Sequence, residues 1–347
     1  DSGLSVDLLK VEGFTNPRAA IIQTLHIHHF SMKKSILNRR SFLSRAASGS
    51  LAVMASKLIS PTDLNAVAPF NRPGKANLKL GLAAYSLRDY FKDASHSRET
   101  PAPESQQIDM FQFIDYCADL GCEGAELTSY YFPEHLDDGY LLKIKRHAFM
   151  RGVAISGTAV GNQFTDLPGS ARSEQIAHVN KWIDRAAIMG APHVRVFAGN
   201  APAQGSWKEA VARCIEGLKR CCDHAATRGV FLGIENHGGI VAEADPLIEI
   251  VESIDSPWLG INLDTGNFHT KDPYGDIAKC APYAVNVQLK VEIAPRGKSK
   301  SPSDLSRLAH ILHGANYQGF VVLEYEAAED PWKAIPMHVE ELKPLLS

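Results

Sequence analysis

Stretches rich in Val, Ile and Leu alternate with amphipathic stretches along the chain from residue 79 onward. Such apolar runs are typical of strands buried on both faces, whereas the stretches between them carry apolar residues at helical spacing. Several helical stretches end in glycine directly before the next apolar run, as helix C-caps do. The expected strands are 79–87, 122–129, 154–164, 191–199, 230–238, 259–267, 284–293 and 319–326.

Eight strand–helix units in roughly 250 residues match the number in a closed α/β barrel. A doubly wound sheet would have fewer strands and a glycine-rich phosphate turn near its start, and neither GxGxxG nor GxxxxGKS occurs in the chain. We therefore predict one α/β domain, a (β/α)8 TIM barrel over residues 75–347. In such a barrel, ligands bind at the carboxyl ends of the strands.

Single polar residues close four successive apolar runs in the second half of the chain. They are Glu235, Asp264, Gln288 and Glu324, separated by 29, 24 and 36 residues. Each gap fits a helix and its return loops, so we expect these residues at the ends of neighbouring strands. A buried carboxylate costs several kcal/mol unless something pairs with it. The pattern predicts four oxygen donors around one divalent cation; the alternative is four unrelated polar residues that cap loops.

Further polar residues are expected near the same strand ends. His237 follows Glu235 by two residues and Lys290 follows Gln288 by two, so in a strand each would face the same side as its neighbour. The alternative for each of these residues is a local hydrogen bond. The candidates for substrate binding are His237, His269, Lys290, Arg195 and Glu126.

The expected first strand–helix loop, residues 93–107, is long, polar and contains proline. Because this loop would lie on the active face of the barrel, it is a candidate lid. The alternative is an insertion without a role in the reaction.

Charge and cysteine content exclude some classes of function. The chain of 347 residues has a net charge of −3, but residues 1–74 carry nine Lys/Arg and four Asp/Glu, so the remainder is acidic. An acidic body argues against nucleic-acid binding, which relies on Lys and Arg at phosphates. None of the six cysteines forms a CxxC pair, so we expect small buried hydrophobic residues rather than a zinc or disulfide framework.

The start of the chain has the features of a targeting segment. Residues 38–43 read NRRSFL after Lys33 and Lys34, a weakly apolar stretch over 46–59 is too short to span a bilayer, and Ala66-Val67-Ala68 resembles a cleavage site. We predict a twin-arginine export signal over 32–68, with residues 1–31 a mis-assigned start or disordered. The protein would then be periplasmic or otherwise extracytoplasmic, without membrane attachment after signal removal. The alternative is a basic amphipathic helix.

Several motifs in this order resemble one family. GxELT after the second strand, IENHGG, LDTGNFH, the xLK end of the seventh strand and the final VxLEYE, within residues 78–346, are similar to the xylose-isomerase-like TIM-barrel superfamily. This group includes sugar isomerases and epimerases related to tagatose and psicose 3-epimerases. The resemblance implies a divalent metal held by Glu235, Asp264 and Glu324, while the family's histidine position falls on Gln288. An all-oxygen ligand set favours Mn²⁺ or Mg²⁺ over Co²⁺ or Zn²⁺.

The resemblance also implies a reaction. Glu235 and Glu324 would be both metal ligands and the acid and base that move a proton next to a sugar carbonyl, through an enediolate. The small-molecule partner would be a sugar or keto-sugar, and barrels of this type often form homodimers. Alternatives are a lyase or hydrolase acting on 3-keto-sugars or glycosides, and a barrel that binds sugar without catalysis. The abasic-site endonuclease branch would need three zinc ions and a basic face, which this sequence lacks.

Overall fold

The computed structural model describes residues 68–95, 101–201 and 206–347. Apart from residue 68, the expected leader (1–31) and export signal (32–68) lie outside the described residues. Residues 96–100, in the middle of the candidate lid, also lie outside them; the described remainder of that segment includes a short 3-10 helix, Glu104–Gln106. The structure therefore leaves the signal and the lid as predictions.

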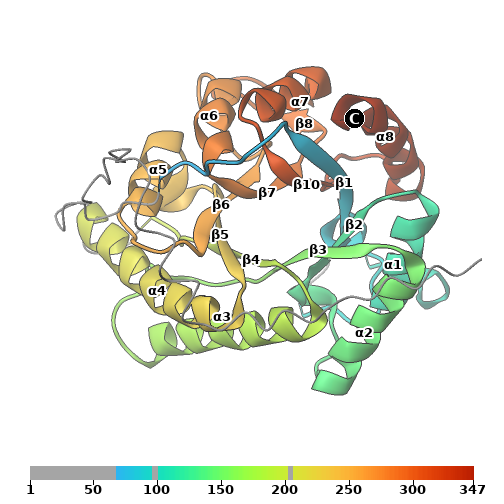
Figure 1. Cartoon of the computed structure of the whole chain (residues 1–347), viewed down its shortest axis with the longest axis horizontal. Coiled ribbons are helices and arrows are strands. Elements are labelled where there is room, and N and C mark those ends of the chain that lie inside the picture. Colours follow the sequence, from blue (N-terminus) through green and yellow to red (C-terminus); the bar gives the residue numbers. More distant parts are fainter. Residues whose placement is uncertain (1–67, 96–100, 202–205) are drawn as a thin grey trace, which may run out of the picture. The chain divides into compact units, whose positions relative to one another are not determined.

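Eight parallel strands close into a barrel, which confirms the predicted (β/α)8 fold (Figure 1). Their order around the ring is β1-β10-β7-β6-β5-β4-β3-β2, so strands β5, β6, β7 and β10 are successive neighbours. β8 (Glu292–Ile293) and β9 (Ser301–Pro302) form a separate antiparallel pair. The barrel strands are β1 (Asn77–Ala83), β2 (Gly124–Thr128), β3 (Ala154–Ala159), β4 (His193–Phe197), β5 (Phe231–Glu235), β6 (Leu259–Asp264), β7 (Ala284–Leu289) and β10 (Gln318–Leu323).

Helices surround the barrel, one after each barrel strand along the chain (Figure 1). Their inner faces pack on the strands, and this layer holds the hydrophobic core. The helices are α1 (Met110–Asp119), α2 (Asp138–Arg151), α3 (Ser170–Met189), α4 (Trp207–Arg228), α5 (Ala244–Glu252), α6 (Pro273–Cys280), α7 (Leu305–Gly314) and α8 (Pro331–Leu346).

Capping residues explain where several helices begin and end. Asp109 and Ser206 each accept from a backbone N–H of the first turn, and each is part of a capping box. Helices α2, α3 and α4 end at Gly152, Gly190 and Gly229, all in the left-handed conformation that glycine adopts without steric cost. The predicted glycine C-caps are confirmed.

Each of the eight barrel strands ends earlier than its apolar run suggested. The run over 230–238 becomes β5, which ends at Glu235, and the run over 259–267 becomes β6, which ends at Asp264. Beyond Glu235, the side chain of Asn236 bonds the backbone of Asp264 twice, through N–H at 2.9 Å and C=O at 2.8 Å. The Asn236 side chain thus takes the place of backbone pairing between β5 and β6 at this point, so the residues after Asn236 can leave the sheet.

The six cysteines are free and buried, as the sequence predicted. Among the described residues, no helix combines the length and the apolar character that crossing a membrane requires. The cysteines pack in the core and lie outside the polar end of the barrel, so they belong to the scaffold.

Candidate active site

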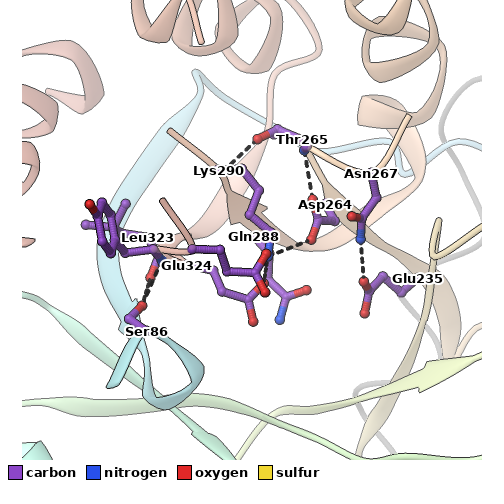
Figure 2. A network of polar contacts seen from close by, with 12 residues as sticks. Ser86, Glu235, Asp264, Thr265, Asn267, Gln288, Lys290, Leu323 and Glu324 are labelled. Atoms are coloured by element: carbon purple, nitrogen blue, oxygen red, sulfur yellow. Dashed lines mark hydrogen bonds and ion pairs between the residues drawn. The ribbon is translucent and has the colours of Figure 1, made fainter. Parts of the chain in front are cut away.

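The four polar residues singled out from the sequence lie together at the carboxyl ends of adjacent strands (Figure 2). Glu235 and Asp264 are the last residues of β5 and β6, Gln288 is the second-last residue of β7, and Glu324 directly follows β10. Their exposed fractions are 3%, 0%, 1% and 5%. Burial of three carboxyl groups in one place requires compensating cations or donors.

The ammonium group of Lys290 compensates two of these carboxylates. Its Nζ lies 2.7 Å from Oε2 of Glu324 and 3.4 Å from Oδ2 of Asp264, and it also contacts Oε2 of Glu326. Figure 2 shows the lysine reaching between Asp264 and Glu324. Burial alone would lower the pKa of Lys290, but the surrounding carboxylates hold that pKa well above its ordinary value. The lysine is therefore a fixed positive charge at the centre of the site.

The third carboxylate has its own cation. Nε of Arg195, from β4, lies 2.9 Å from Oε2 of Glu235, and Nδ2 of Asn267 donates to Oε1 at 2.9 Å. The guanidinium also stacks over the Phe197 ring, with its Cζ 4.1 Å from the ring centroid. Both oxygens of Glu235 thus have partners that fix the carboxylate plane toward the cavity.

Beneath the site, four buried side chains close a ring of hydrogen bonds. Gln288 Nε2 donates to Glu126 Oε1 at 2.7 Å, and Asn262 Nδ2 donates to Gln288 Oε1 at 2.6 Å. Asn286 Nδ2 donates both to Asn262 Oδ1, at 2.9 Å, and to Glu126 Oε2, at 2.8 Å. The amide of Gln288 therefore has a partner at each end, and both partners belong to this ring.

Burial raises the pKa of the carboxyl groups. The pKa of Glu235 rises to about 7 because burial disfavours its charge; Arg195 opposes the shift and Glu324 adds to it. The pKa of Asp264 also rises to about 7, again through burial, with Lys290 opposing and Glu235 adding repulsion. Burial raises the pKa of Glu126 to about 7 as well. Carboxyls with such values can accept and return protons near neutral pH.

A cavity of about 380 Å³ opens above these groups. Both Glu235 and Glu324 border it, together with aromatic rings and several charged side chains. The volume suits a small molecule. The lining residues are Tyr85, Arg88, Asp89, Tyr130, Tyr131, Arg195, Phe197, Glu235, His237, Asn267, Lys290, Glu324 and Glu326.

Three of the five residues expected to bind substrate line the cavity, and two do not. Arg195, Lys290 and His237 line the cavity, the last with its ring 4.5 Å from that of Phe197. Glu126 is fully buried in the ring below and does not border the cavity. His269 is exposed outside this cavity, where its Nδ1 lies 3.1 Å from the carbonyl oxygen of Ala294.

Several lining residues were not anticipated from the sequence. Glu326 follows Glu324 by two residues, the same offset that singled out His237 and Lys290, so the alternation of strand residues could have identified it. Tyr85 and Arg88 come from the loop after β1, where a short 3-10 helix (Ala84–Leu87) brings them over the barrel. No sequence pattern marks them, because only closure of the ring places β1 beside β10.

The expected metal site can be compared with this geometry. In residues 68–95, 101–201 and 206–347, no three or more His, Cys, Asp and Glu side chains are grouped as a metal site. The donor types nevertheless fit a hard divalent cation, because Glu235, Asp264 and Glu324 offer carboxylate oxygens. Oδ2 of Asp264 is buried and accepts no hydrogen bond, and a cation already faces it, since Lys290 Nζ lies 3.4 Å away. The carbonyl oxygen of Gln288, the expected fourth ligand, accepts a hydrogen bond from Asn262 Nδ2 at 2.6 Å.

A family profile described as "Xylose isomerase-like TIM barrel" matches residues 114–342. This range includes strands β2 to β10 and all four strand-end residues. No curated protein matches the chain.

Solved structures share the fold at low identity. The apo 3-keto-D-glucoside 4-epimerase YcjR from E. coli superimposes with a TM-score of 0.59 at 16% identity, covering 77% of this chain and 99% of that one. D-Psicose 3-epimerase from Clostridium cellulolyticum H10, solved with D-tagatose, gives 0.58 at 15% identity, covering 77% and 94%. A xylose isomerase-like TIM barrel protein from Mycobacterium smegmatis, in complex with magnesium, gives 0.60 at 17% identity, covering 77% and 96%. These likenesses establish the common barrel.

Proposed function

The chain belongs to the xylose isomerase-like TIM barrel family, and from this premise we propose that it is a sugar isomerase or epimerase that moves a proton next to a carbonyl group. One observation carries the proposal. Glu235 and Glu324 both border the cavity, one from β5 and one from the end of β10. Two carboxylates that reach one cavity from different strands are what proton removal and proton return require.

The two carboxylates come from different sides of the site. β5 and β10 are separated in the ring by β6 and β7, and Figure 2 shows Glu235 and Glu324 on either side of Lys290. A sugar carbon held between them meets one carboxylate on each face. One carboxylate removes the proton, and the other returns it to the opposite face for epimerisation or to the neighbouring carbon for isomerisation.

Glu235 suits the role of proton acceptor. Burial raises the pKa of the Glu235 carboxyl to about 7, and a bound cation would lower this pKa and keep the group ionised, ready to accept a proton. Arg195 and Asn267 hold its two oxygens, so the carboxylate keeps one orientation while it gains and loses a proton. His237 borders the same part of the cavity and is in position to bind a sugar hydroxyl.

We assign the metal to Glu235, Asp264 and Glu324, with Mn²⁺ or Mg²⁺ preferred because the donors are all oxygen. When bound there, the ion would polarise the sugar carbonyl and stabilise the negative charge that develops on its oxygen. Gln288 is not needed as a ligand in this assignment, since its amide orients the buried ring below the site. Oδ2 of Asp264 accepts no hydrogen bond and has only an ion pair of 3.4 Å with Lys290, which supports the choice of donors.

Deuterium exchange tests the proposal directly. The purified protein, with added Mn²⁺, is incubated in D₂O with a panel of ketoses, aldoses and 3-keto-glucosides, and products are followed by NMR and mass spectrometry. We expect one sugar to gain a single carbon-bound deuterium and change configuration without other mass change. Glu235→Gln and Glu324→Gln should each reduce the rate at least 100-fold, whereas exposed Glu243→Gln, the matched control, should not.

Two outcomes would refute this function. Absence of carbon-bound deuterium in every sugar, with binding detected by calorimetry, would indicate a sugar-binding barrel. An unsaturated or cleaved product would indicate a lyase or hydrolase acting on a keto-sugar. Both alternatives keep the same cavity, so product identity alone separates them from the isomerase.

We also propose that the protein is exported by the twin-arginine route, because Arg39 and Arg40 form the twin-arginine pair in the sequence. Expression of the full chain in a bacterial host and fractionation of periplasm from cytoplasm tests it. We expect the protein in the periplasmic fraction and its retention in the cytoplasm for Arg39→Lys/Arg40→Lys. Equal distribution of parent and variant would contradict export.

A further inference from the structure

We propose that the ammonium group of Lys290 and the divalent cation compete for the same carboxylate oxygens, and that Glu326 receives the lysine when the cation binds. The inference rests on the metal assignment made under the proposed function, and it adds a residue that controls metal loading. The lysine contacts these oxygens in the structure, and binding of the cation would move its ammonium group to the edge of the cavity.

Distances establish the conflict. Lys290 Nζ lies 2.7 Å from Glu324 Oε2 and 3.4 Å from Asp264 Oδ2, which are oxygens of two of the assigned ligands. A divalent cation needs its oxygen ligands within about 2.0–2.6 Å. An ammonium group in contact with the same two oxygens occupies that space and repels the ion, so the two cations exclude each other.

The base of the lysine side chain cannot move away. The backbone N–H of Lys290 donates to Thr265 Oγ1 at 2.9 Å, which fixes this end of β7. A Cβ on Gly266 would lie 2.6 Å from Cγ of Lys290 and 2.8 Å from its Cβ, so the lysine stem runs directly over this glycine. Only the outer methylene groups and the ammonium group are free to change position.

The structure contains a place for the displaced ammonium group. Glu326 already contacts Lys290 Nζ, and at 32% side-chain exposure it lies nearer the surface than Glu324, at 6%. A side cavity of about 140 Å³ borders Lys290, Glu326, Glu292 and Gly266. The ammonium group can therefore leave Asp264 and Glu324 without losing an acidic partner or entering an apolar environment.

The charge balance favours a lysine that moves within the site when the cation binds over a lysine that leaves the site. Four carboxylates, those of Glu235, Asp264, Glu324 and Glu326, face the two cations Arg195 and Lys290. When all are ionised, two negative charges remain, which one divalent cation neutralises. The loaded site keeps the lysine beside Glu326 and facing the cavity, where it can donate to a substrate oxygen.

Manganese binding tests the competition without any need for a substrate. Free Mn²⁺ is titrated by electron paramagnetic resonance against metal-stripped protein at fixed pH. We expect Lys290→Met to bind Mn²⁺ at least 10-fold more tightly than the parent. Arg88→Met is the matched control, because Arg88 borders the cavity and donates to the Tyr325 carbonyl at 3.3 Å but contacts none of the ligands. Loss of this nearby charge should change the dissociation constant less than 3-fold.

Glu326→Gln tests the second half of the proposal. Without its alternative carboxylate, the lysine stays at Asp264 and Glu324, so we expect Mn²⁺ to bind several-fold more weakly. Lys290→Gln serves if Lys290→Met does not fold, and circular dichroism verifies each variant. Unchanged or weaker binding in both lysine variants would overturn the competition, and unchanged binding in Glu326→Gln would overturn the role of Glu326.

The metal-binding result also separates this inference from the proposed function. If the parent protein binds no Mn²⁺ and a lysine variant does, the competition is supported, because the ammonium group then excludes the ion. The same result would refute the metal dependence of the proposed reaction. Tight binding in every variant supports a metal site but refutes the competition. Deuterium exchange into sugars, measured independently, decides the reaction itself.

Discussion

Gln288 and Glu126 are joined across the interior of the barrel by a hydrogen bond of 2.7 Å from Nε2 to Oε1. The two residues are 162 positions apart in the sequence and lie on β7 and β2, which two further strands separate in the ring. Gln288, one of the four strand-end residues, therefore belongs to a polar layer below the site. This layer replaces the apolar side chains that usually fill a barrel of this type.

The polar layer predicts a pH-dependent stability. The pKa of Glu126 is about 7 in the folded chain against 4.5 in the unfolded chain, so the folded state binds more protons between these values. The contribution of Glu126 to the free energy of unfolding is complete below pH 4.5 and is lost as the pH rises through 7. The loss is about 3.5 kcal/mol for 2.5 units at 1.4 kcal/mol per unit. Urea denaturation of metal-stripped protein from pH 5 to 8 measures this. Glu126→Gln should reduce the dependence of the free energy of unfolding on pH. An identical pH dependence in parent and variant would contradict the raised pKa of Glu126.

The Arg195–Glu235 pair predicts asymmetric effects of single and double substitution. Arg195→Met leaves a buried carboxyl without its cation, so we expect the free energy of unfolding to fall by about 3–5 kcal/mol near pH 8, where Glu235 is ionised. Arg195→Met/Glu235→Gln removes the uncompensated charge and should recover most of the loss. Denaturant midpoints for the parent, both single variants and the double variant give the coupling energy. Additive effects would mean that the two groups do not interact.

Metal addition should stabilise the folded protein. If Glu235, Asp264 and Glu324 hold the ion only in the folded state, Mn²⁺ at 100 times its dissociation constant adds about 2.7 kcal/mol to the free energy of unfolding. Asp264→Asn removes a charged ligand and should abolish most of this gain, while an excess of chelator should remove it from the parent. Thermal unfolding with and without Mn²⁺ measures both effects. A gain that persists in Asp264→Asn would place the ion elsewhere.

The close approach of β3 and β4 predicts a sensitive glycine. A Cβ on Gly157 would lie 1.9 Å from Cε1 of His193, whose ring is buried with 3% exposure beside Glu126. Gly157→Ala should therefore reduce the free energy of unfolding by about 3 kcal/mol, at the upper end of overpacking effects. Gly314→Ala, at the end of α7, is the matched control, because an added Cβ there would meet no neighbouring atom within 4 Å. This substitution should be neutral or should stabilise the protein by up to about 1 kcal/mol. Equal midpoints for the two variants would contradict the clash.

The fold was predictable because its signals are local. Apolar runs, glycine C-caps such as Gly190 and capping residues such as Asp109 each act within a few residues, and eight repeats of one unit leave few architectures. The predicted carboxyl ends of the strands were less accurate than the predicted fold. β6 stops at Asp264, where the side chain of Asn236 takes over the pairing, and a long-range contact of this kind leaves no periodic signal.

The candidate site was predictable in membership more than in geometry. Glu235, Asp264 and Glu324 were identified because carboxylates at the ends of buried strands need a reason to be there. The orientation of Gln288 was not, since its amide turns toward Asn262 and Glu126, residues from other strands. Lys290 was expected to bind substrate, but the cluster of three carboxylates around its ammonium group was not expected.

The sequence by itself determined the barrel, the order of its strands and the strand-end residues that face its mouth, because periodicity and spacing along the chain encode these features directly. Only the tertiary structure decided which charges meet. Closure of the ring places β1 beside β10, which brings Tyr85 and Arg88 over the cavity, and it lets Glu126 of β2 reach Gln288 of β7 beneath the cavity. The energy of a buried charge depends on neighbours a few ångströms away in space, and distance along the chain does not specify them.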